Sequence, residues 1–214
     1  MKPVEGNIHH LRENYENGEL DITNMYPSPL LQFASWFEGA AKADIPEPNA
    51  MVLSTVSAEG KPSSRVVLLK EFNGNGFIFF TNYNSKKGHD LLQNPNACLN
   101  FWWGKMERQI RITGIIEKIS EKESDDYFYS RPIGSQAGAI ISPQSSEIES
   151  REWLEQKFIA VQLSGNIKRP ANWGGFILIP DSLEFWQGRS NRLHDRLVYE
   201  KTENGDWKIK RIAP

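Results

Sequence analysis

Apolar and polar positions near the N-terminus follow a helical pattern. Apolar side chains recur at helical spacing from Leu30 to Ala41. Ser28 stands where a helix N-cap is expected, and Pro29 suits the first helical position. Residues 1–24 are polar and poor in large hydrophobic side chains. They predict a flexible arm ahead of a single domain at residues 25–214, because no linker-like stretch divides the rest of the chain.

The middle of the chain predicts antiparallel strands, because short apolar runs are separated by turns that contain Gly and Asn. A short helix between Ser85 and Asn94 interrupts them, with Ser85 as its cap. Ser120 and Glu123 match a capping box, which opens a helix that ends near Pro132. The predicted strands are 51–56, 63–72, 77–82, 97–103 and 108–119.

The C-terminal part predicts two helices followed by a return to strands. The helices are expected at 135–141 and 147–163, and the strands at 173–179, 182–187, 194–200 and 206–212. The simplest architecture is a small antiparallel barrel, mainly β with flanking helices (α+β).

Composition and charge narrow the possible partners. A formal net charge of -2 gives no overall attraction to nucleic acid or to an acidic membrane. The N-terminus has no secretory signal pattern, and no apolar run approaches the ~20 residues of a membrane span. Cys98 is the single cysteine and the four histidines lack ligand spacing, so we expect no disulfide and no metal site. These features predict a cytoplasmic protein.

The chain lacks the common phosphate-binding loops GxGxxG and GxxxxGK[ST]. Any bound anion must therefore be held by side chains and by the ends of strands and helices. Ser85, Lys86 and Lys87 begin a predicted helix, where free N–H groups and the helix dipole favour an anion. A solvated basic turn explains the same residues about equally well. Arg65 and Lys70 flank an apolar strand, and taken alone they are explained better by side chains that reach solvent.

Two further clusters could carry chemistry. Tyr127 and Arg131 are spaced to share a helix face ahead of Ser135, which would cap the next helix, and together they could grip a phosphate or form a capping cluster. Arg192, His194 and Arg196 would share one face of an extended segment, where three such groups are tolerable only near anions or in solvent. A structural role is the ordinary explanation of a lone histidine. Trp186 lies just upstream and could pack on a flat cofactor.

Taken in order, these segments resemble the pyridoxine/pyridoxamine 5′-phosphate oxidases from about Leu11 to Pro214. The most specific of the matching pieces are SRPIGSQ and RLHDR. The others are LRENY, SSRVVLLK, FTNYNSKKG, ERQIRITG, SPQSS, WGGF and WKIKRIAP.

The resemblance implies an antiparallel split β-barrel that binds FMN at the interface of a homodimer. The FMN contacts that it implies are Arg65, Val66, Val67, Leu68, Leu69, Lys70, Phe80, Thr81, Lys86, Lys87, Gln109, Gln144, Ser145, Trp186 and Arg196. The substrate contacts that it implies are Arg12, Tyr15, Lys70, Tyr127, Arg131, Ser135, Arg192 and His194, with Arg192 and His194 as the catalytic pair. Glu13 stands where the family often has a basic residue, and Lys86 where it often has Arg.

The implied activity is oxidation of pyridoxine or pyridoxamine 5′-phosphate to pyridoxal 5′-phosphate. FMN would take a hydride from C4′ of the substrate, and O2 would reoxidise the reduced flavin to give H2O2. The amine substrate would give an imine, which water hydrolyses. His194 could act as a base or as a group that orients the ring. Two rival interpretations are a split-barrel flavoenzyme with a different substrate and a non-catalytic binder of flavin or pyridoxal phosphate.

Overall fold

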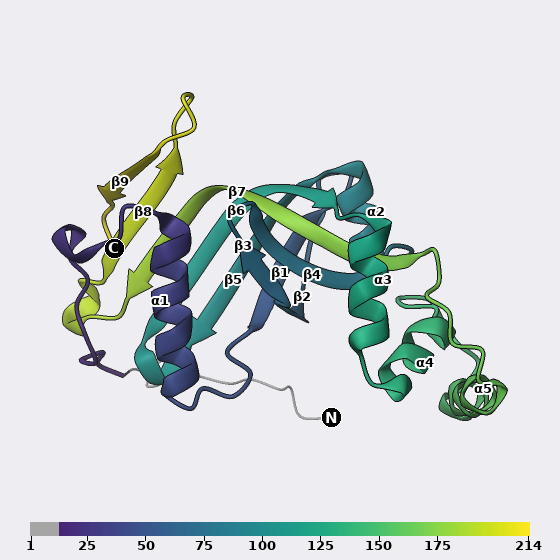
Figure 1. The fold of residues 1–214 in the computed structure, drawn as a ribbon. Coiled ribbons are helices and arrows are strands. Elements are labelled where there is room, and N and C mark those ends of the chain that lie inside the picture. The colour runs from purple at the N-terminus through teal and green to yellow at the C-terminus, as the bar shows by residue number, and fades with distance from the viewer. Residues whose placement is uncertain (1–12) are drawn as a thin grey trace, which may run out of the picture. The chain divides into compact units, whose positions relative to one another are not determined.

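The computed structural model describes residues 13–214, which form two compact units. Unit 1 contains residues 13–45, 102–110 and 184–214, and unit 2 contains residues 46–101 and 111–183. Neither unit is a continuous stretch of chain. The central strands contribute to both units, because the chain passes from one unit to the other within them (Figure 1).

The structure is mainly β with flanking helices, which confirms the predicted fold class. The strands are β1 (Ala50–Val56), β2 (Pro62–Leu68), β3 (Glu71–Asn73), β4 (Gly76–Asn82), β5 (Asn96–Trp103), β6 (Arg108–Lys118), β7 (Trp173–Gln187), β8 (Asp195–Lys201) and β9 (Trp207–Arg211). The α-helices are α1 (Pro29–Lys42), α2 (Lys86–Gln93), α3 (Glu121–Ser130), α4 (Ile133–Ile141) and α5 (Arg151–Ser164). The short 3-10 turns are η1 (Ile22–Asn24), η2 (Gly104–Met106) and η3 (Ser190–Arg192).

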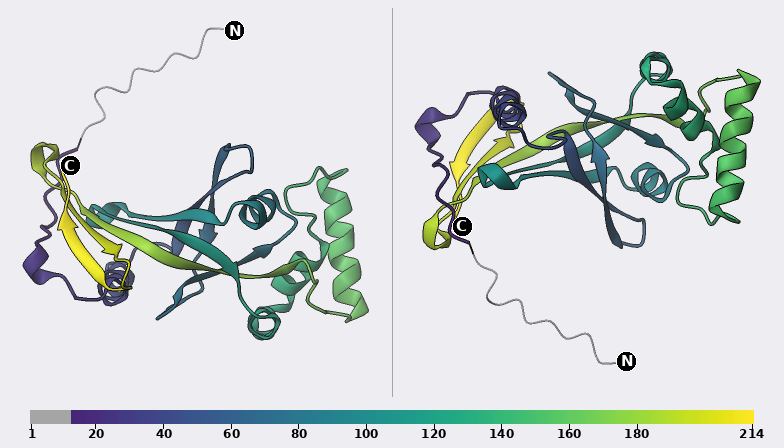
Figure 2. Two further views of the ribbon diagram at one scale, coloured as in Figure 1. Left: turned by 90° about the horizontal axis from the view of Figure 1, so that it is seen from above. Right: turned by 90° about the horizontal axis from the view of Figure 1, so that it is seen from below.

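Unit 2 is built on an antiparallel sheet with the strand order β2-β1-β5-β6-β7-β4-β3. β1 alternates buried and half-buried positions, as expected for a strand with one face on the core. Phe77, Phe79, Phe101 and Phe176 are fully buried within this unit. α4 and α5 lie side by side in both views of Figure 2.

Unit 1 holds α1 together with β8 and β9, which pair antiparallel. Ser28 caps α1 and Pro29 opens it, as the sequence predicts. The apolar face of α1 buries Phe33, Trp36 and Ala40, and the Trp36 ring meets Phe185 edge-on at 5.2 Å between centroids.

Residues 13–24, which belong to the arm predicted at 1–24, make hydrogen bonds to distant parts of the chain. The main-chain N–H of Asn17 donates to Glu107 over 2.9 Å, and that of Leu20 donates to Asp195 over 3.1 Å. The Leu20 side chain is buried. Carboxylates from distant parts of the chain thus satisfy main-chain donors in this segment, which local composition cannot reveal.

Several element boundaries differ from the predictions. The strand predicted at 63–72 is divided into β2 and β3, with a break at Leu69 and Lys70. β7 is one continuous strand, although Pro180 and Asp181 suggest a turn between two strands. β6 runs so close to it that a Cβ on Gly114 would lie 2.1 Å from the main-chain oxygen of Ile179. α4 begins at Ile133 with Pro132 at its N-cap, so Ser135 does not cap it. α5 begins at Arg151 after its cap Ser150, later than predicted.

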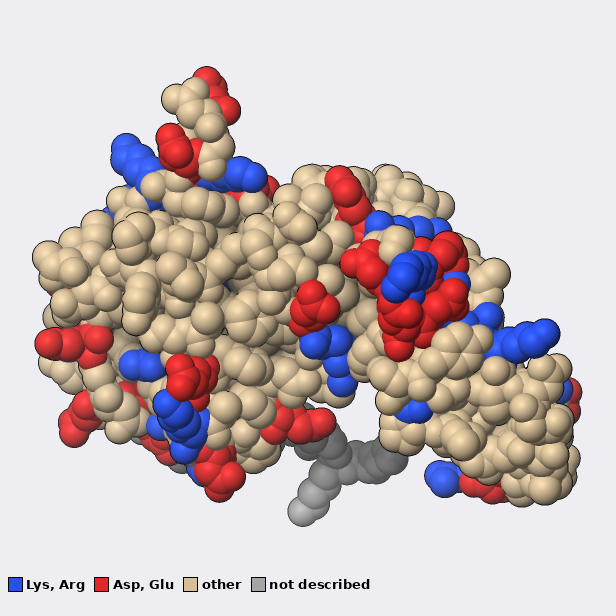
Figure 3. Space-filling model, in the orientation of Figure 1, with Lys and Arg blue, Asp and Glu red and all other residues tan. Residues whose placement is uncertain are grey.

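The predicted capping box of α3 is present: Ser120 and Glu123 bond reciprocally. Acidic side chains gather over this helix (Figure 3). The largely buried guanidinium of Arg169 bridges two of them, Glu121 and Asp125, with its Nε 2.6 Å from Asp125. Arg169 also donates to the main-chain oxygen of Trp173 over 2.6 Å, so it ties α3 to the start of β7.

No helix among residues 13–214 is long and apolar enough to cross a membrane. In the same part of the chain, no group of three or more His, Cys, Asp or Glu side chains is arranged to hold a metal ion.

Candidate functional site

A cavity of about 650 Å³ opens within unit 2, in the size range of small-molecule sites. Four cationic side chains line it: Arg65, Lys70, Lys87 and Arg131. No Asp or Glu is among the lining residues. A cavity wall with several cations and no carboxylate is suited to bind an anion, because the cations repel one another until a negative charge enters.

The cavity brings together most of the site residues that the resemblance implies for this part of the chain. Lining residues that the sequence singled out are Arg65, Val66, Val67, Leu68, Lys70, Phe80, Thr81, Lys87, Tyr127, Arg131, Ser135 and Gln144. Lining residues that sequence reasoning missed are Asn82, Pro132, Gly138, Ala139, Ser142 and Trp173. Asn82 and Pro132 adjoin predicted site residues, and Trp173 begins the WGGF motif, so position along the chain was the available signal.

Three predicted residues of unit 2 do not line the cavity. Leu69 lies between β2 and β3, and its side chain is buried in the core. Lys86 forms an ion pair with Asp90 at 3.3 Å within the first turns of α2. Ser145 is exposed and has a left-handed backbone, with φ of 73°.

Lys87 is a buried cation at the start of α2. Its Nζ donates to Gln144 Oε1 over 2.8 Å and to Thr81 Oγ1 over 3.2 Å. Burial, and then the charge of Arg65, lower the pKa of Lys87 to about 8. An anion in the cavity would remove the penalty for charging this ammonium.

Arg131 is another of the cationic side chains that line the cavity. It is the residue that follows α3, with an extended backbone, and therefore does not share a helix face with Tyr127 as predicted. Its Nη2 donates to the main-chain oxygen of Ser135 over 2.8 Å, and its guanidinium lies over the Trp173 ring at 4.6 Å. Nη1 of Arg131 is buried and has no hydrogen-bond partner among the described residues.

Aromatic rings form the wall beside Arg131. Phe80 and Tyr127 stack with 3.9 Å between centroids, and Phe80 and Trp173 stack at 5.6 Å. These planes hold the Tyr127 ring in one orientation at the cavity edge. A flat, apolar wall next to cations suits an aromatic ligand that carries a phosphate.

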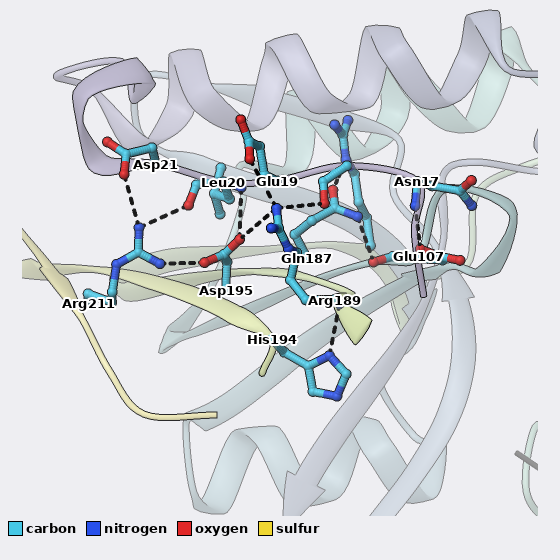
Figure 4. Close-up of polar contacts among 12 residues, drawn as sticks. Asn17, Glu19, Leu20, Asp21, Glu107, Gln187, Arg189, His194, Asp195 and Arg211 are labelled. Atoms are coloured by element: carbon cyan, nitrogen blue, oxygen red, sulfur yellow. Dashed lines mark hydrogen bonds and ion pairs between the residues drawn. The ribbon is translucent and has the colours of Figure 1, made fainter. Parts of the chain in front are cut away.

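Unit 1 contains a second cluster, around His194, whose ring accepts a hydrogen bond from the main chain of Arg189 (Figure 4). The His194 ring lies 4.6 Å from the Trp186 ring and 5.7 Å from the Tyr15 ring. Tyr15, Arg192 and His194 line a second cavity of about 580 Å³. Gly188 makes room for Tyr15, because a Cβ on it would lie 2.7 Å from the tyrosine Cγ.

The extended arrangement predicted for Arg192 and His194 is wrong. Arg192 belongs to a 3-10 turn, and both Asn191 and Arg192 have left-handed backbones with φ of 54° and 61°. β8 starts only at Asp195. The two side chains share a cavity because of this strained turn, and not because of strand alternation.

Two other predicted residues of unit 1, Gln109 and Arg196, are not among those that line this cavity. Arg196 pairs with the buried carboxylate of Glu184 at 2.7 Å and also donates to the main-chain oxygen of Ala213. Gln109 is half-buried on β6. Arg12 lies outside the described residues.

His194 has a defined hydrogen-bond pattern. The main-chain N–H of Arg189 donates to its Nδ1 over 3.1 Å. Partial burial, and then the charge of Arg192, lower the pKa of His194. Since a main-chain N–H can only donate, Nδ1 carries no proton, and in the neutral ring the proton is on Nε2.

Two family models together match most of the chain. Residues 37–165 match the model described as pyridoxamine 5′-phosphate oxidase. Residues 173–214 match the model described as the pyridoxine 5′-phosphate oxidase C-terminal dimerisation region.

Curated relatives and solved structures agree with these matches. The pyridoxine/pyridoxamine 5′-phosphate oxidase of Nostoc punctiforme is 53% identical over 95% of this chain and 97% of its own length. The protein of the same name from Burkholderia mallei is 52% identical with the same coverage.

Among solved structures, PhzG from Burkholderia lata, in complex with tetrahydrophenazine-1-carboxylic acid, superposes with a TM-score of 0.87. It is 32% identical, over 92% of this chain and 100% of that chain. A pyridoxamine 5′-phosphate oxidase-related, FMN-binding protein from Nostoc punctiforme has the same fold, with a TM-score of 0.73 at 17% identity over 89% of this chain and 100% of that chain. The split β-barrel expected from the sequence is thereby confirmed.

The lowered pKa of Lys87 predicts how anion binding depends on pH. Sulfate keeps its charge above neutral pH, so a change in its affinity reports on the protein. Below pH about 8, Lys87 is charged in the free protein and affinity is at its plateau. Above that pH, binding requires proton uptake, so affinity falls with a limiting slope of about tenfold per pH unit. Calorimetric titrations between about pH 7 and about pH 10 measure this dependence.

The matched control is Lys87→Arg. Arginine stays protonated throughout this range, so the decline above pH about 8 should disappear in the variant. A sulfate affinity that is flat with pH in the wild-type protein would contradict the assignment of Lys87 to the anion site.

Proposed function

Because the chain belongs to the pyridoxamine 5′-phosphate oxidase family, we propose that it is an FMN-dependent oxidase of pyridoxine and pyridoxamine 5′-phosphates. Its product is pyridoxal 5′-phosphate, and its electron acceptor is O2, which yields H2O2. A cytoplasmic location belongs to the same proposal.

The observation that carries this proposal is the unpaired Nη1 of Arg131 in the wall of the unit 2 cavity. A buried guanidinium nitrogen without an acceptor costs free energy, on the order of 1–3 kcal/mol or more. A phosphate of the substrate supplies that acceptor. Lys70, Tyr127 and Ser135 line the same cavity and complete the phosphate site of the proposal.

The remaining cationic groups of the cavity fit the phosphate of FMN. Arg65 and Lys87 supply the charge, and Thr81 and Gln144 supply polar contacts beside Lys87. When bound, FMN would supply the hydride acceptor for oxidation at C4′ and the route for electrons to O2. The residues of this chain bind the two phosphates and orient the substrate ring against its wall of aromatic side chains.

His194 acts in this proposal as a hydrogen-bond donor that orients the substrate, and not as a general base. Its Nδ1 is occupied by the Arg189 N–H, so the neutral ring offers only the Nε2 proton. Arg192 shares the cavity and keeps positive charge next to the imidazole, which opposes proton uptake.

The proposed assembly is a homodimer with FMN at the subunit interface. The match of residues 173–214 to a dimerisation region supports it. Trp186, Arg192, His194 and Arg196 belong to unit 1, whereas the cationic cavity belongs to unit 2. Their contribution to one site is therefore part of the proposal, with the second subunit as a source of these residues.

The similarity to PhzG, which was solved in complex with tetrahydrophenazine-1-carboxylic acid, supports a rival, a flavoenzyme that acts on a compound of that kind. The curated relatives named pyridoxine/pyridoxamine 5′-phosphate oxidase are closer in sequence, at 53% against 32% identity.

Substrate screening of the purified protein tests the function. We expect a yellow protein that carries FMN and consumes O2 with pyridoxamine and pyridoxine 5′-phosphates, and far less with unphosphorylated pyridoxine. Preferred turnover of tetrahydrophenazine-1-carboxylic acid would support the rival. Flavin binding without O2 consumption would indicate a non-catalytic binder.

Arg131→Ala should separate substrate binding from flavin binding. Hydrogen bonds to charged groups contribute about 1.5–3 kcal/mol, so we expect substrate affinity to fall by roughly ten- to a hundredfold. FMN content, measured by absorbance, should hardly change. Arg151→Ala removes an exposed arginine that pairs with Glu155 and should change neither property. Loss of flavin with intact substrate affinity would show that Arg131 serves the other phosphate.

His194→Gln and His194→Ala should differ if His194 is a donor. The Gln amide replaces the Nε2 proton, so its rate of anaerobic flavin reduction should stay within about tenfold of wild type. Loss of a general base typically costs ~10²–10⁴-fold, and it would slow both variants alike. Equal, large losses in single-turnover reduction at saturating substrate would therefore refute the donor role.

A further inference from the structure

Asp90 is a buried carboxylate that the proposed function leaves without a role. It lies on α2, and 4% of the residue is exposed. Its Oδ2 accepts the hydroxyl of Thr55 on β1 over 2.7 Å and that of Ser63 on β2 over 3.0 Å. Lys86 is 3.3 Å from its carboxylate oxygens, from one helical turn earlier. Three elements thus converge on one negative charge.

The same two hydroxyls contact Arg65. Nη1 of Arg65 lies 2.9 Å from Thr55 Oγ1, and Nη2 lies 2.6 Å from Ser63 Oγ. A guanidinium can only donate, and an ionised carboxylate can only accept. Both hydroxyl protons must therefore point to Asp90, while the hydroxyl lone pairs face Arg65. The hydrogen bonds that reach Asp90, together with the charge of Lys86, outweigh the effect of its burial and keep its pKa below the ordinary value.

This arrangement determines which edge of Arg65 is left for a ligand. Nη1 also donates to the main-chain oxygens of Leu53 and Ser63, over 3.1 and 3.3 Å. Nε and the second hydrogen of Nη2 take part in none of the hydrogen bonds found within residues 13–214. These two donors form the side edge of the guanidinium, which matches two phosphate oxygens.

We propose that Asp90 is a positioning residue for the anion site of unit 2. Acting through the hydroxyls of Thr55 and Ser63, it occupies the end of the Arg65 guanidinium and so presents the Nε–Nη2 edge to the cavity. The anion is the phosphate of FMN, and in that respect the inference rests on the proposed function.

The direction in which FMN affinity changes when Asp90 is replaced distinguishes a positioning role from simple charge repulsion. A carboxylate close to an anion site repels the anion, so charge alone predicts that removal of Asp90 strengthens FMN binding. Positioning predicts the opposite for Asp90→Ala, because the hydroxyls lose their acceptor and Arg65 loses its fixed orientation. Asp90→Asn keeps an acceptor oxygen in place, so its affinity should stay at or above that of wild type.

The experiment is titration of the apo-protein with FMN, followed by quenching of flavin fluorescence. We expect Asp90→Ala to bind FMN about tenfold or more weakly and Asp90→Asn to restore binding. Asp126→Ala is the matched control, because it removes an exposed acid that pairs with Lys122 at i,i+4 and should change nothing. Asp90→Ala that binds FMN as tightly as wild type, or more tightly, would overturn the inference.

A second pair of variants guards against local unfolding of α2 in Asp90→Ala. Thr55→Val and Ser63→Ala leave Asp90 and the helix in place but remove one hydroxyl each. Each should weaken FMN binding by roughly two- to tenfold, and unchanged affinity in both would also overturn the inference. If wild-type protein binds no FMN, the proposed function fails, whereas sulfate titration of the same variants still tests Asp90.

Discussion

The repulsion between cations that share one cavity is the constraint that organises unit 2. Arg65, Lys70, Lys87 and Arg131 line the cavity, and the lining contains no carboxylate to neutralise them. Asp90 carries a balancing charge outside this wall, and the hydroxyls of Thr55 and Ser63 lie between its carboxylate and the Arg65 guanidinium. Main-chain oxygens, a glutamine and an aromatic ring stabilise the cations without cancelling their charge. The positive potential is therefore preserved for a ligand.

In unit 1, ion pairs and hydrogen bonds hold a polar segment, residues 18–21, that has few apolar side chains to bury. Arg189, Asp195 and Arg211 alternate in charge along the loop and β-strands beneath residues 18–21 (Figure 4). Arg189 and Arg211 donate to the main-chain oxygens of Gly18 and Leu20. Individual exposed ion pairs contribute little, but these also satisfy main-chain groups. The same Arg189 fixes the His194 tautomer through its own N–H.

Features set by neighbours in the chain could be predicted from the sequence. The caps of α1, α2 and α3 depend on residues within one turn, and the predicted Ser28, Ser85 and Ser120 all form them. The fold class could also be predicted from the hydrophobic pattern, and most cavity residues of unit 2 from the family resemblance. The strained turn at Arg192 and the role of Asp90 could not be predicted. Asp90 contacts hydroxyls 35 and 27 residues away, and no local pattern identifies such partners.

The interleaving of the two units along the chain has a consequence for how the protein folds. Hydrogen bonds such as that from Arg211 to Leu20 join residues 191 positions apart, so unit 1 closes only when both of its outer segments are available. Unit 2 contains residues 46–101 and 111–183, and so includes neither of these outer segments. Long-range closure of this kind is slow, and Trp36 of α1 must meanwhile lack Phe185, the ring that it meets edge-on in the folded unit. Refolding yield should therefore depend on how long the apolar face of α1 stays exposed before residues 184–214 pack against it.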